Sequence, residues 1–387
     1  MGVTYSESQR ENGDSNTDGR MDWTDFLRRP RIEASSDWAE QYTGKAILVA
    51  GAGGSIGSHL ARRLIAAQPR LLILLDRSEH DLYRIHAELS AASDRAHLTA
   101  LLADICDEAA MEDVLGNNRP DIVYHAAAFK HVPILERNPF AALRNNALGS
   151  WTLANAAVRA GVPRLVALST DKAAGPASVL GTSKRIAELA LLRLSDSPTR
   201  ITSLRLGNVL GSRGSVVPLF EEQIASSGPV TVTHPEARRF FLTLDESVEL
   251  LLAAALASGG KDLLVPELGD PIFIAHLAEF LIRRAGFTPG KEILLAFTGL
   301  RPGDKLSEDL IAANERRLEA VGSTLYRVAT PAPSAHELDK WIGELQQTVE
   351  RRDGMAVLEI LSRMLPDYQP SETLRKALER SGSEVRA

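Results

Sequence analysis

The sequence predicts an α/β protein with a doubly wound, parallel Rossmann sheet and a smaller C-terminal lobe. Three observations favour this class. From Lys45 onward, short and almost entirely apolar segments alternate with amphipathic helical segments, which is typical of a parallel sheet covered by helices on both faces. A glycine-rich turn directly follows the first apolar segment, and an acidic residue ends the second. The chain of 387 residues is long enough for one large or two ordinary domains.

The expected strands and helices alternate regularly through the first half of the chain. Each expected strand is short and apolar on both faces, so it needs helices above and below it. In chain order, the expected elements are the strand KAILVA (45–50), a helix over 55–67, the strand LLILL (71–75), a helix, the strand HLTALLA (97–103), a helix, the strand DIVYHAAA (121–128), a helix over 138–160 and the strand RLVALS (164–169).

The second half of the chain is less regular. After ITSLRLGNV (201–209), glycine and proline become more frequent, and we expect a smaller lobe whose helices include 245–257 and 274–285. From about Ser334 a helical period predicts a C-terminal cap or interface. The expected division is a disordered tail over 1–24, a linker over 25–44, the Rossmann domain over 45–205, the smaller lobe over 206–333, partly interleaved with the sheet, and a helical extension over 334–387.

Composition narrows the class of partner before any motif is considered. Hydrophobic residues make up 44% of the chain and charged residues 24%, as in ordinary globular proteins. The net charge of −6 gives no reason to expect nucleic acid or an anionic membrane as a partner. The single cysteine, Cys106, excludes an intramolecular disulfide and a cysteine-based zinc cluster, and we expect no metal site. No apolar run reaches the roughly 18 to 20 residues of a membrane span, so we expect a cytoplasmic protein without one.

The segment LVAGAGGSIGSHL (48–60) has the pattern of a dinucleotide-binding turn. Gly51, Gly54 and Gly57 come directly after an expected strand and open an expected helix. Glycines in this context permit a tight turn and a close approach to a pyrophosphate, whose charge is stabilised by the first helical amides, at Ser55 and Ile56. An ordinary tight turn is the alternative. The strand before, the helix after and an acid at the expected distance favour the dinucleotide.

That acid is Asp76, nineteen residues beyond Gly57. A carboxylate here binds the ribose hydroxyls of adenosine and repels a 2′-phosphate, which favours NAD; Arg77, the next residue, leaves NADP as the alternative. Asp104 and Ile105 follow the third expected strand, where an adenine edge would lie, although Asp104 is equally typical of a helix N-cap. The other expected cofactor contacts are Ala126 and Ala127 after the fourth strand, with Ser169 and Lys184 at the chemical site.

The segment STDKAAGPASVLGTSK (169–184) contains the residues expected to carry the chemistry. Short-chain dehydrogenases use a tyrosine four residues before a lysine on one helix face, and here Lys184 is present but Leu180 stands at the tyrosine position. Asp171 and Lys172 are adjacent and follow an expected strand, which places them at the carboxyl edge where such sheets bind ligands. An adjacent acid and base are what a proton-transferring elimination requires. A capped turn with a solvated charge pair is the alternative.

Taken together, the motifs give the chain a resemblance to a known family. It resembles the bacterial UDP-N-acetylglucosamine 4,6-dehydratases of polysaccharide and glycan biosynthesis, which are extended short-chain dehydrogenases. The resemblance runs from Asp25 to Tyr368, and DFLRRPRIE (25–33) resembles the link that follows the membrane segments of membrane-anchored members, although we expect no such segments here. The motifs, in order, are GAGGSIG, DICD, PDIVYHAAAFKHVPILE, STDKAAGP, RLGNVLGSRGSVVPLF, THPEARRFFLT and TGLRPGDKLSEDL.

The resemblance implies a reaction in which NAD takes a hydride from C4 of the sugar, a base removes the C5 proton, an acid protonates the departing C6 hydroxyl, and the hydride returns to C6. It implies Asp171 as the acid and Lys172 as the base. We expect the two to point at different substrate atoms, because contact would favour the charged form of each. One branch of the family has methionine at the position of Leu180 and stays active. We then expect Thr170 to hold the C4 hydroxyl, with Lys184 or water as the final proton acceptor.

A UDP-sugar carries two negative phosphates, so an acidic protein must gather cations locally. The smaller lobe supplies Arg213, Arg239 and Arg301. The resemblance implies that Arg239 and Arg301 pair with the diphosphate and that Asp304 approaches the uridine ribose, although the family usually has glutamate at that position. The expected substrate-binding residues are Lys130, which follows the fourth strand and faces the same edge, Asn208, Arg239, Arg301 and Asp304.

Two other functions stay open from the sequence. A nucleotide-sugar 4-epimerase would share the fold but needs no acid for C6, so the Asp171 and Lys172 pair argues against it. A catalytically inactive NAD-binding relative is suggested by Leu180. For the dehydratase itself, the resemblance to the branch without tyrosine favours retention at C5 over inversion. We also expect a homo-oligomer, because this fold commonly pairs through helices.

Overall fold

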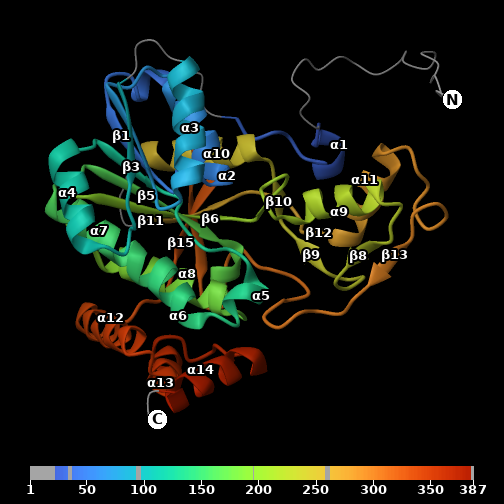
Figure 1. Cartoon of the computed structure of the whole chain (residues 1–387). Helices are drawn as coiled ribbons and strands as arrows, with labels where there is room; N and C mark the ends of the chain where they lie inside the picture. Colours follow the sequence, from blue (N-terminus) through green and yellow to red (C-terminus); the bar gives the residue numbers. More distant parts are fainter. Residues whose placement is uncertain (1–21, 34–36, 93–96, 195, 258–261, 385–387) are drawn as a thin grey trace.

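One large mixed sheet forms the centre of the molecule (Figure 1). The computed structural model describes residues 22–33, 37–92, 97–194, 196–257 and 262–384, so residues 1–21 of the predicted tail lie outside it. Within this part of the chain, nine strands pair in the order β14-β15-β11-β6-β5-β4-β1-β2-β3. The strands are β1 (Ala46–Ala50), β2 (Leu71–Asp76), β3 (His97–Leu102), β4 (Ile122–His125), β5 (Arg164–Thr170), β6 (Arg200–Leu206), β11 (Asp262–Pro266), β14 (Arg316–Val321) and β15 (Leu325–Ala329).

The strand directions confirm the predicted α/β class. Strands β1 to β6 and β11 run parallel, whereas β15 pairs antiparallel with β11 and β14 antiparallel with β15. The sheet grows in one direction from β1 through β2 and in the other through β4. This reversal between β1 and β4 leaves a crevice at their carboxyl ends, which is where ligands bind open α/β sheets.

Helices cover both faces of the sheet because alternate strand residues point to opposite sides. On one face, Val49 and Leu74 pack with α2 (Ser55–Ile65), α3 (Glu79–Ala92) and α10 (Leu244–Leu256). On the other, Leu48 and Ile73 pack with α4 (Glu108–Asn118) and α7 (Gly149–Arg159), beside which lies α8 (Val179–Leu194). The helix predicted over 138–160 is composed of α6 (Pro139–Ala142), a π-helical segment η2 (Leu143–Leu148) and α7.

The smaller lobe lies beside the carboxyl edge of the sheet (Figure 1). It is built from helices and short strand pairs around a core that includes Phe220 and Leu277. The helix α1 (Thr24–Leu27) belongs to this core, since the Phe26 ring packs on Phe241 and Phe280. Its other elements are β7 (Asn208–Val209), α9 (Val216–Ala225), β8 (Val230–Val232), β9 (Arg238–Arg239), β10 (Phe241–Leu242), β12 (Ile272–Phe273), α11 (Ile274–Arg284) and β13 (Leu295–Phe297).

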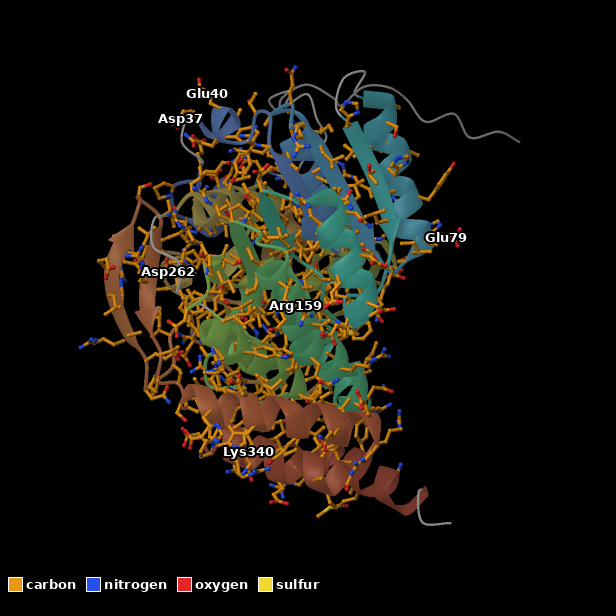
Figure 2. All side chains as sticks on the ribbon, turned by 90° about the vertical axis from the view of Figure 1, so that its left-hand side faces the viewer. Asp37, Glu40, Glu79, Arg159, Asp262 and Lys340 are labelled. Atoms are coloured by element: carbon orange, nitrogen blue, oxygen red, sulfur yellow. The ribbon has the colours of Figure 1, made fainter. Side chains whose placement is uncertain are left out.

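The C-terminal extension forms a helical layer under the sheet domain. Its helices are α12 (Ala335–Glu350), α13 (Gly354–Met364) and α14 (Glu372–Glu384), and α12 packs on α8 and η2. A capping box between Ser334 and Glu337 fixes the start of α12. Figure 2 shows Lys340 in this layer and Arg159 of α7 in the layer next to the sheet. In the described part of the chain, no helix is long and apolar enough to cross a membrane.

Candidate active site

The glycine-rich loop after β1 has the geometry that the sequence predicts. Gly51 has φ +82°, and a Cβ on Gly57 would lie 2.0 Å from the Gly51 carbonyl oxygen, so both positions require glycine. The loop ends where α2 begins, at Ser55. Asp76, at the end of β2, accepts hydrogen bonds from the backbone amides of Gly53 (2.9 Å) and Ser78 (2.9 Å). The predicted acid therefore lies directly beside the predicted loop.

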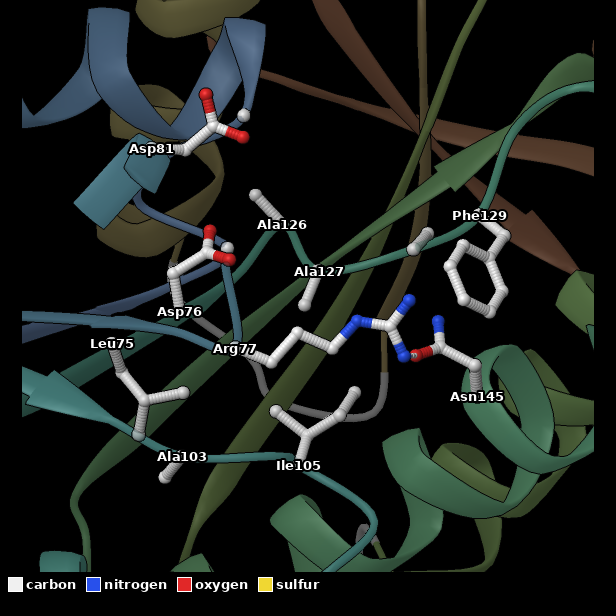
Figure 3. Close-up of a pocket in the computed structure, with 13 residues that line it drawn as sticks. Leu75, Asp76, Arg77, Asp81, Ala103, Ile105, Ala126, Ala127, Phe129 and Asn145 are labelled. Carbon is white, nitrogen blue, oxygen red and sulfur yellow. Dashed lines mark hydrogen bonds between the residues drawn. The ribbon is translucent and has the colours of Figure 1, made fainter. Parts of the chain in front are cut away.

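A cavity of about 180 Å³ opens at the carboxyl ends of β1, β2 and β4 (Figure 3). Arg77 extends across it, with its guanidinium 4.1 Å from the centre of the Phe129 ring and 3.2 Å from Asn145 Oδ1. The lining contains seven of the predicted cofactor contacts and adds Phe129 and Asn145. It comprises Gly51, Gly54, Leu75, Asp76, Arg77, Asp81, Ala103, Ile105, Ala126, Ala127, Ala128, Phe129 and Asn145.

Asp104 does not cap a helix. Its carboxylate accepts the Cys106 amide (3.0 Å) in its own turn, whereas the N-cap of α4 is Asp107, which accepts from Ala110 (3.0 Å). The alternative prediction, that Asp104 is the N-cap of a helix, is therefore wrong. The next residue, Ile105, lines the cavity.

Arg213 joins the smaller lobe to the glycine-rich loop. Its backbone amide donates to Ser55 Oγ (3.0 Å), and its guanidinium donates to Asp81 (2.6 Å) and to the Gly53 carbonyl. The Arg213 hydrogen bond holds the pKa of Asp81 below its usual range. Nearby, the Lys130 ammonium lies 3.4 Å from Ser212 Oγ, and burial, with Arg213 beside it, lowers the pKa of Lys130. Arg213 therefore contacts the loop that is expected to bind the pyrophosphate.

Asp171 and Lys172 follow β5 in a short 3-10 turn and are in direct contact. Lys172 Nζ lies 2.9 Å from Asp171 Oδ1 and 3.1 Å from Asn208 Oδ1. The Thr170 hydroxyl donates to the same Asp171 oxygen at 2.9 Å. The expectation that acid and base point at different atoms is therefore wrong for this structure: the pair forms a salt bridge in a site where Asp171 is fully buried.

Lys184 and Leu180 lie on α8, one turn apart. Burial lowers the pKa of Lys184 to about 8, although Glu188 acts against this. Leu180 is also buried and belongs to a hydrophobic cluster with Val132 and residues of the C-terminal helices. The Ser169 hydroxyl, predicted as a cofactor contact, donates to Glu188 at 2.6 Å.

Unlike Arg213, both Arg239 and Arg301 contact residues of their own lobe. Arg239 is buried and donates to the carbonyls of Lys305 (2.9 Å) and Leu306 (3.2 Å). Arg301 is exposed and pairs with Asp304 at 2.8 Å. Arg239 therefore holds the loop 301–308, where the exposed Arg301 pairs with an Asp304 side chain that is only 7% exposed.

Glu308 was not predicted as a site residue. It lies in the same loop, with its carboxylate 3.7 Å from Lys172 Nζ and 4.0 Å from Arg239 Nε. Its motif, TGLRPGDKLSEDL, was identified in the sequence, but nothing in the spacing distinguishes it from the exposed Asp309 that follows.

Comparison with known proteins agrees with this fold and site. Together they define a Rossmann protein of the extended short-chain dehydrogenase/reductase class. The sequence model described as "Polysaccharide biosynthesis protein" matches residues 47–330, and the chain belongs to this family.

Individual proteins and solved structures are also similar to this chain. The capsular polysaccharide biosynthesis protein CapD of Staphylococcus aureus is 44% identical over 80% of this chain and 52% of its own length, so the chain spans about half of that relative. A UDP-N-acetylglucosamine 4,6-dehydratase (inverting) of Campylobacter jejuni is 30% identical over 74% of this chain and 84% of its own length. Among solved structures, Pen from Bacillus thuringiensis has a TM-score of 0.68 at 28% identity, over 78% of this chain and 98% of that one. The dTDP-glucose 4,6-dehydratase DesIV of Streptomyces venezuelae, solved with NAD bound, has a TM-score of 0.60 at 22% identity, over 68% and 87%, which shows the shared fold.

Proposed function

We propose that the protein is an NAD-dependent nucleotide-sugar 4,6-dehydratase that converts UDP-N-acetylglucosamine to the 4-keto-6-deoxy sugar for surface polysaccharide or glycan biosynthesis. The observation that carries the proposal is the contact of Thr170, Asp171 and Lys172 at the carboxyl end of β5. The membership of the polysaccharide family and the Campylobacter jejuni relative support the choice of substrate.

The residues of the cavity fit NAD. The glycine-rich loop and the start of α2 would hold the pyrophosphate, and Asp76 would bind the adenosine ribose and disfavour a 2′-phosphate. Ile105 and Arg77 border the region expected for adenine. NAD, when bound, supplies a reversible hydride acceptor; every proton transfer is left to the protein.

Thr170 and Asp171 offer a route for the C4 proton without a tyrosine. The Thr170 hydroxyl would receive a hydrogen bond from the C4 hydroxyl, and it already donates to Asp171. As the hydride leaves C4, the proton can pass through Thr170 to the Asp171 carboxylate. The protonated Asp171 would then donate to the departing C6 hydroxyl. The proton lost from C4 thus leaves with water, and Asp171 returns to its starting state.

Lys172 would remove the C5 proton and later return it. The Asn208 contact orients its amine toward the smaller lobe, where the sugar would lie. Leu180 fits this scheme because an apolar side chain suffices where no phenol is needed. On this basis we assign the protein to the branch without tyrosine and propose retention at C5, whereas the printed name of the Campylobacter jejuni relative specifies inversion.

The test is an incubation of the full chain with UDP-N-acetylglucosamine and NAD in deuterated water, followed by proton NMR. We expect a new C6 methyl signal with deuterium at C5, and ring couplings that show the retained configuration. UDP-N-acetylgalactosamine as product would indicate a 4-epimerase. An unchanged sugar in the presence of bound NAD would contradict this substrate and function.

A further inference from the structure

The proposed mechanism leaves one requirement open. In the structure Lys172 is paired with Asp171, and a paired ammonium cannot accept the C5 proton. Lys172 must first lose a proton to another group. Asp171 cannot accept the Lys172 proton, because it receives the C4 proton through Thr170.

Glu308 is placed to meet this requirement. It is 3% exposed, and its Oε1 lies 3.7 Å from Lys172 Nζ. Its other oxygen, Oε2, lies 3.7 Å from Lys305 Nζ and has no hydrogen-bond partner among the described residues. A buried carboxylate oxygen without a hydrogen-bond partner destabilises the fold, and a catalytic role is one explanation for such a group.

The backbone around Glu308 is held by the neighbouring strand β9. Arg239 donates to the carbonyls of Lys305 and Leu306, and the Arg238 amide donates to the Leu306 carbonyl at 2.7 Å. The carboxylate therefore keeps its place beside Lys172. The 3.7 Å between the Lys172 and Glu308 atoms exceeds a hydrogen bond, so proton transfer requires the Lys172 amine to move toward Glu308 once Asp171 is protonated.

We propose that Glu308 accepts a proton from the Lys172 ammonium and so frees the amine that removes the C5 proton of the sugar. One Nζ–H bond breaks and one Oε–H bond forms, with no other reactant. Once Asp171 is protonated, Lys172 loses its partner, and Glu308 is the remaining carboxylate beside it. After water has left and C5 has regained its proton, Glu308 returns its proton to Lys172. The inference rests on the proposed function, whose reaction it completes.

The charges around Glu308 are compatible with both of its protonation states. Burial raises the pKa of Glu308, and Asp171 raises it further, while Lys172, Arg239 and Lys305 act in the opposite direction. A carboxyl with opposing influences of this kind can gain and lose a proton within one turnover.

Glu308→Gln tests the proposal, because glutamine keeps the shape but cannot accept the proton. We expect this variant still to reduce NAD, seen as NADH absorbance on adding UDP-N-acetylglucosamine, because C4 oxidation does not need the free amine. Exchange of the C5 proton with deuterated water should fall about 100-fold or more. The matched control is Asp309→Asn, the exposed carboxylate next in the chain, which should leave both rates unchanged.

Three results would overturn the inference. They are C5 exchange at the wild-type rate in Glu308→Gln, an equal loss of NADH formation and C5 exchange, and a matching loss in Asp309→Asn. If Glu308→Gln does not fold, Glu308→Asp is used. It should slow C5 exchange while NADH formation persists, and unchanged exchange would count against the proposal. A wild-type enzyme that forms no keto sugar would instead refute the proposed function, so the two failures are distinguishable.

Discussion

Lys184 retains a buried charge at a cost to stability. It is 6% exposed on α8, and burial lowers its pKa from 10.5 to about 8. Each pH unit corresponds to about 1.4 kcal/mol, so folding disfavours the ammonium by about 3 kcal/mol. Lys184→Met removes the charge and keeps an unbranched apolar side chain. We expect the variant to be more stable than the wild type at pH 7.

The expected gain depends on pH in a defined direction. Below pH 8 the lysine is protonated in both the folded and the unfolded state, and the full cost is present. Between about pH 8 and 10.5 the unfolded state binds more protons, so the contribution of this group to wild-type stability rises with pH. The advantage of Lys184→Met should therefore be about 2–3 kcal/mol at pH 7 and fall below about 1 kcal/mol at pH 10.

Urea unfolding followed by circular dichroism at the two pH values measures this difference. Lys340→Met is the matched control, because that side chain is 60% exposed on α12. Its effect should stay within about 0.5 kcal/mol at both pH values. Equal stability of wild type and Lys184→Met at pH 7, or an advantage that is the same at pH 7 and 10, would refute this account of the buried ammonium.

Four further outcomes are expected. Burial, with Asp104 nearby, raises the pKa of Cys106 to about 12. The Cys106 thiol should therefore resist alkylation at pH 8 until urea unfolds the protein. Rapid labelling of the folded protein would contradict this. Arg205 donates two hydrogen bonds to Glu188 and two to Glu315. Arg205→Met should lower the free energy of unfolding by about 3–5 kcal/mol, because two buried carboxylates lose these bonds and keep Arg185 as a partner; a loss under about 1 kcal/mol would mean that Arg205 is dispensable. Although burial acts to raise it, Arg205 lowers the pKa of Glu315 to about 2, so the stability that this carboxylate contributes should decline as the pH falls from about 4.5 toward 2 in an acid titration. Arg213→Ala should speed dissociation of bound NAD, because the side-chain contact between the smaller lobe and the glycine-rich loop is lost. The rate is measured by fluorescence after dilution. An unchanged dissociation rate would show that this contact does not retain the cofactor.

The features that the sequence predicted correctly depend on local requirements. Gly51 and Gly57 are constrained by their own turn, so the dinucleotide-type loop could be predicted from spacing. Asp76 could be predicted because it ends an apolar strand at a fixed distance from that loop. The parallel sheet follows in the same way from short apolar segments separated by helical ones.

The features that the sequence did not predict depend on contacts between distant segments. Asn145 lines the cavity and belongs to a π-helical segment. The sequence of this segment does not distinguish it from the α-helices on either side. Glu308 reaches Lys172 only because Arg239 holds its loop against β9. The contact of Lys172 with Asp171 was not predicted, because a neutral lysine and a protonated aspartic acid, the forms that the reaction uses, have no ionic attraction.

The most direct test of the central claim is the fate of a hydride. UDP-N-acetylglucosamine carrying deuterium at C4 is incubated with the full chain and NAD in ordinary water, and the product is examined by NMR and mass spectrometry. A 4,6-dehydratase built on Thr170, Asp171 and Lys172 should deliver the deuterium to the C6 methyl group of the 4-keto product. Recovery of the deuterium at C4 of an epimerised or unchanged sugar would contradict the account.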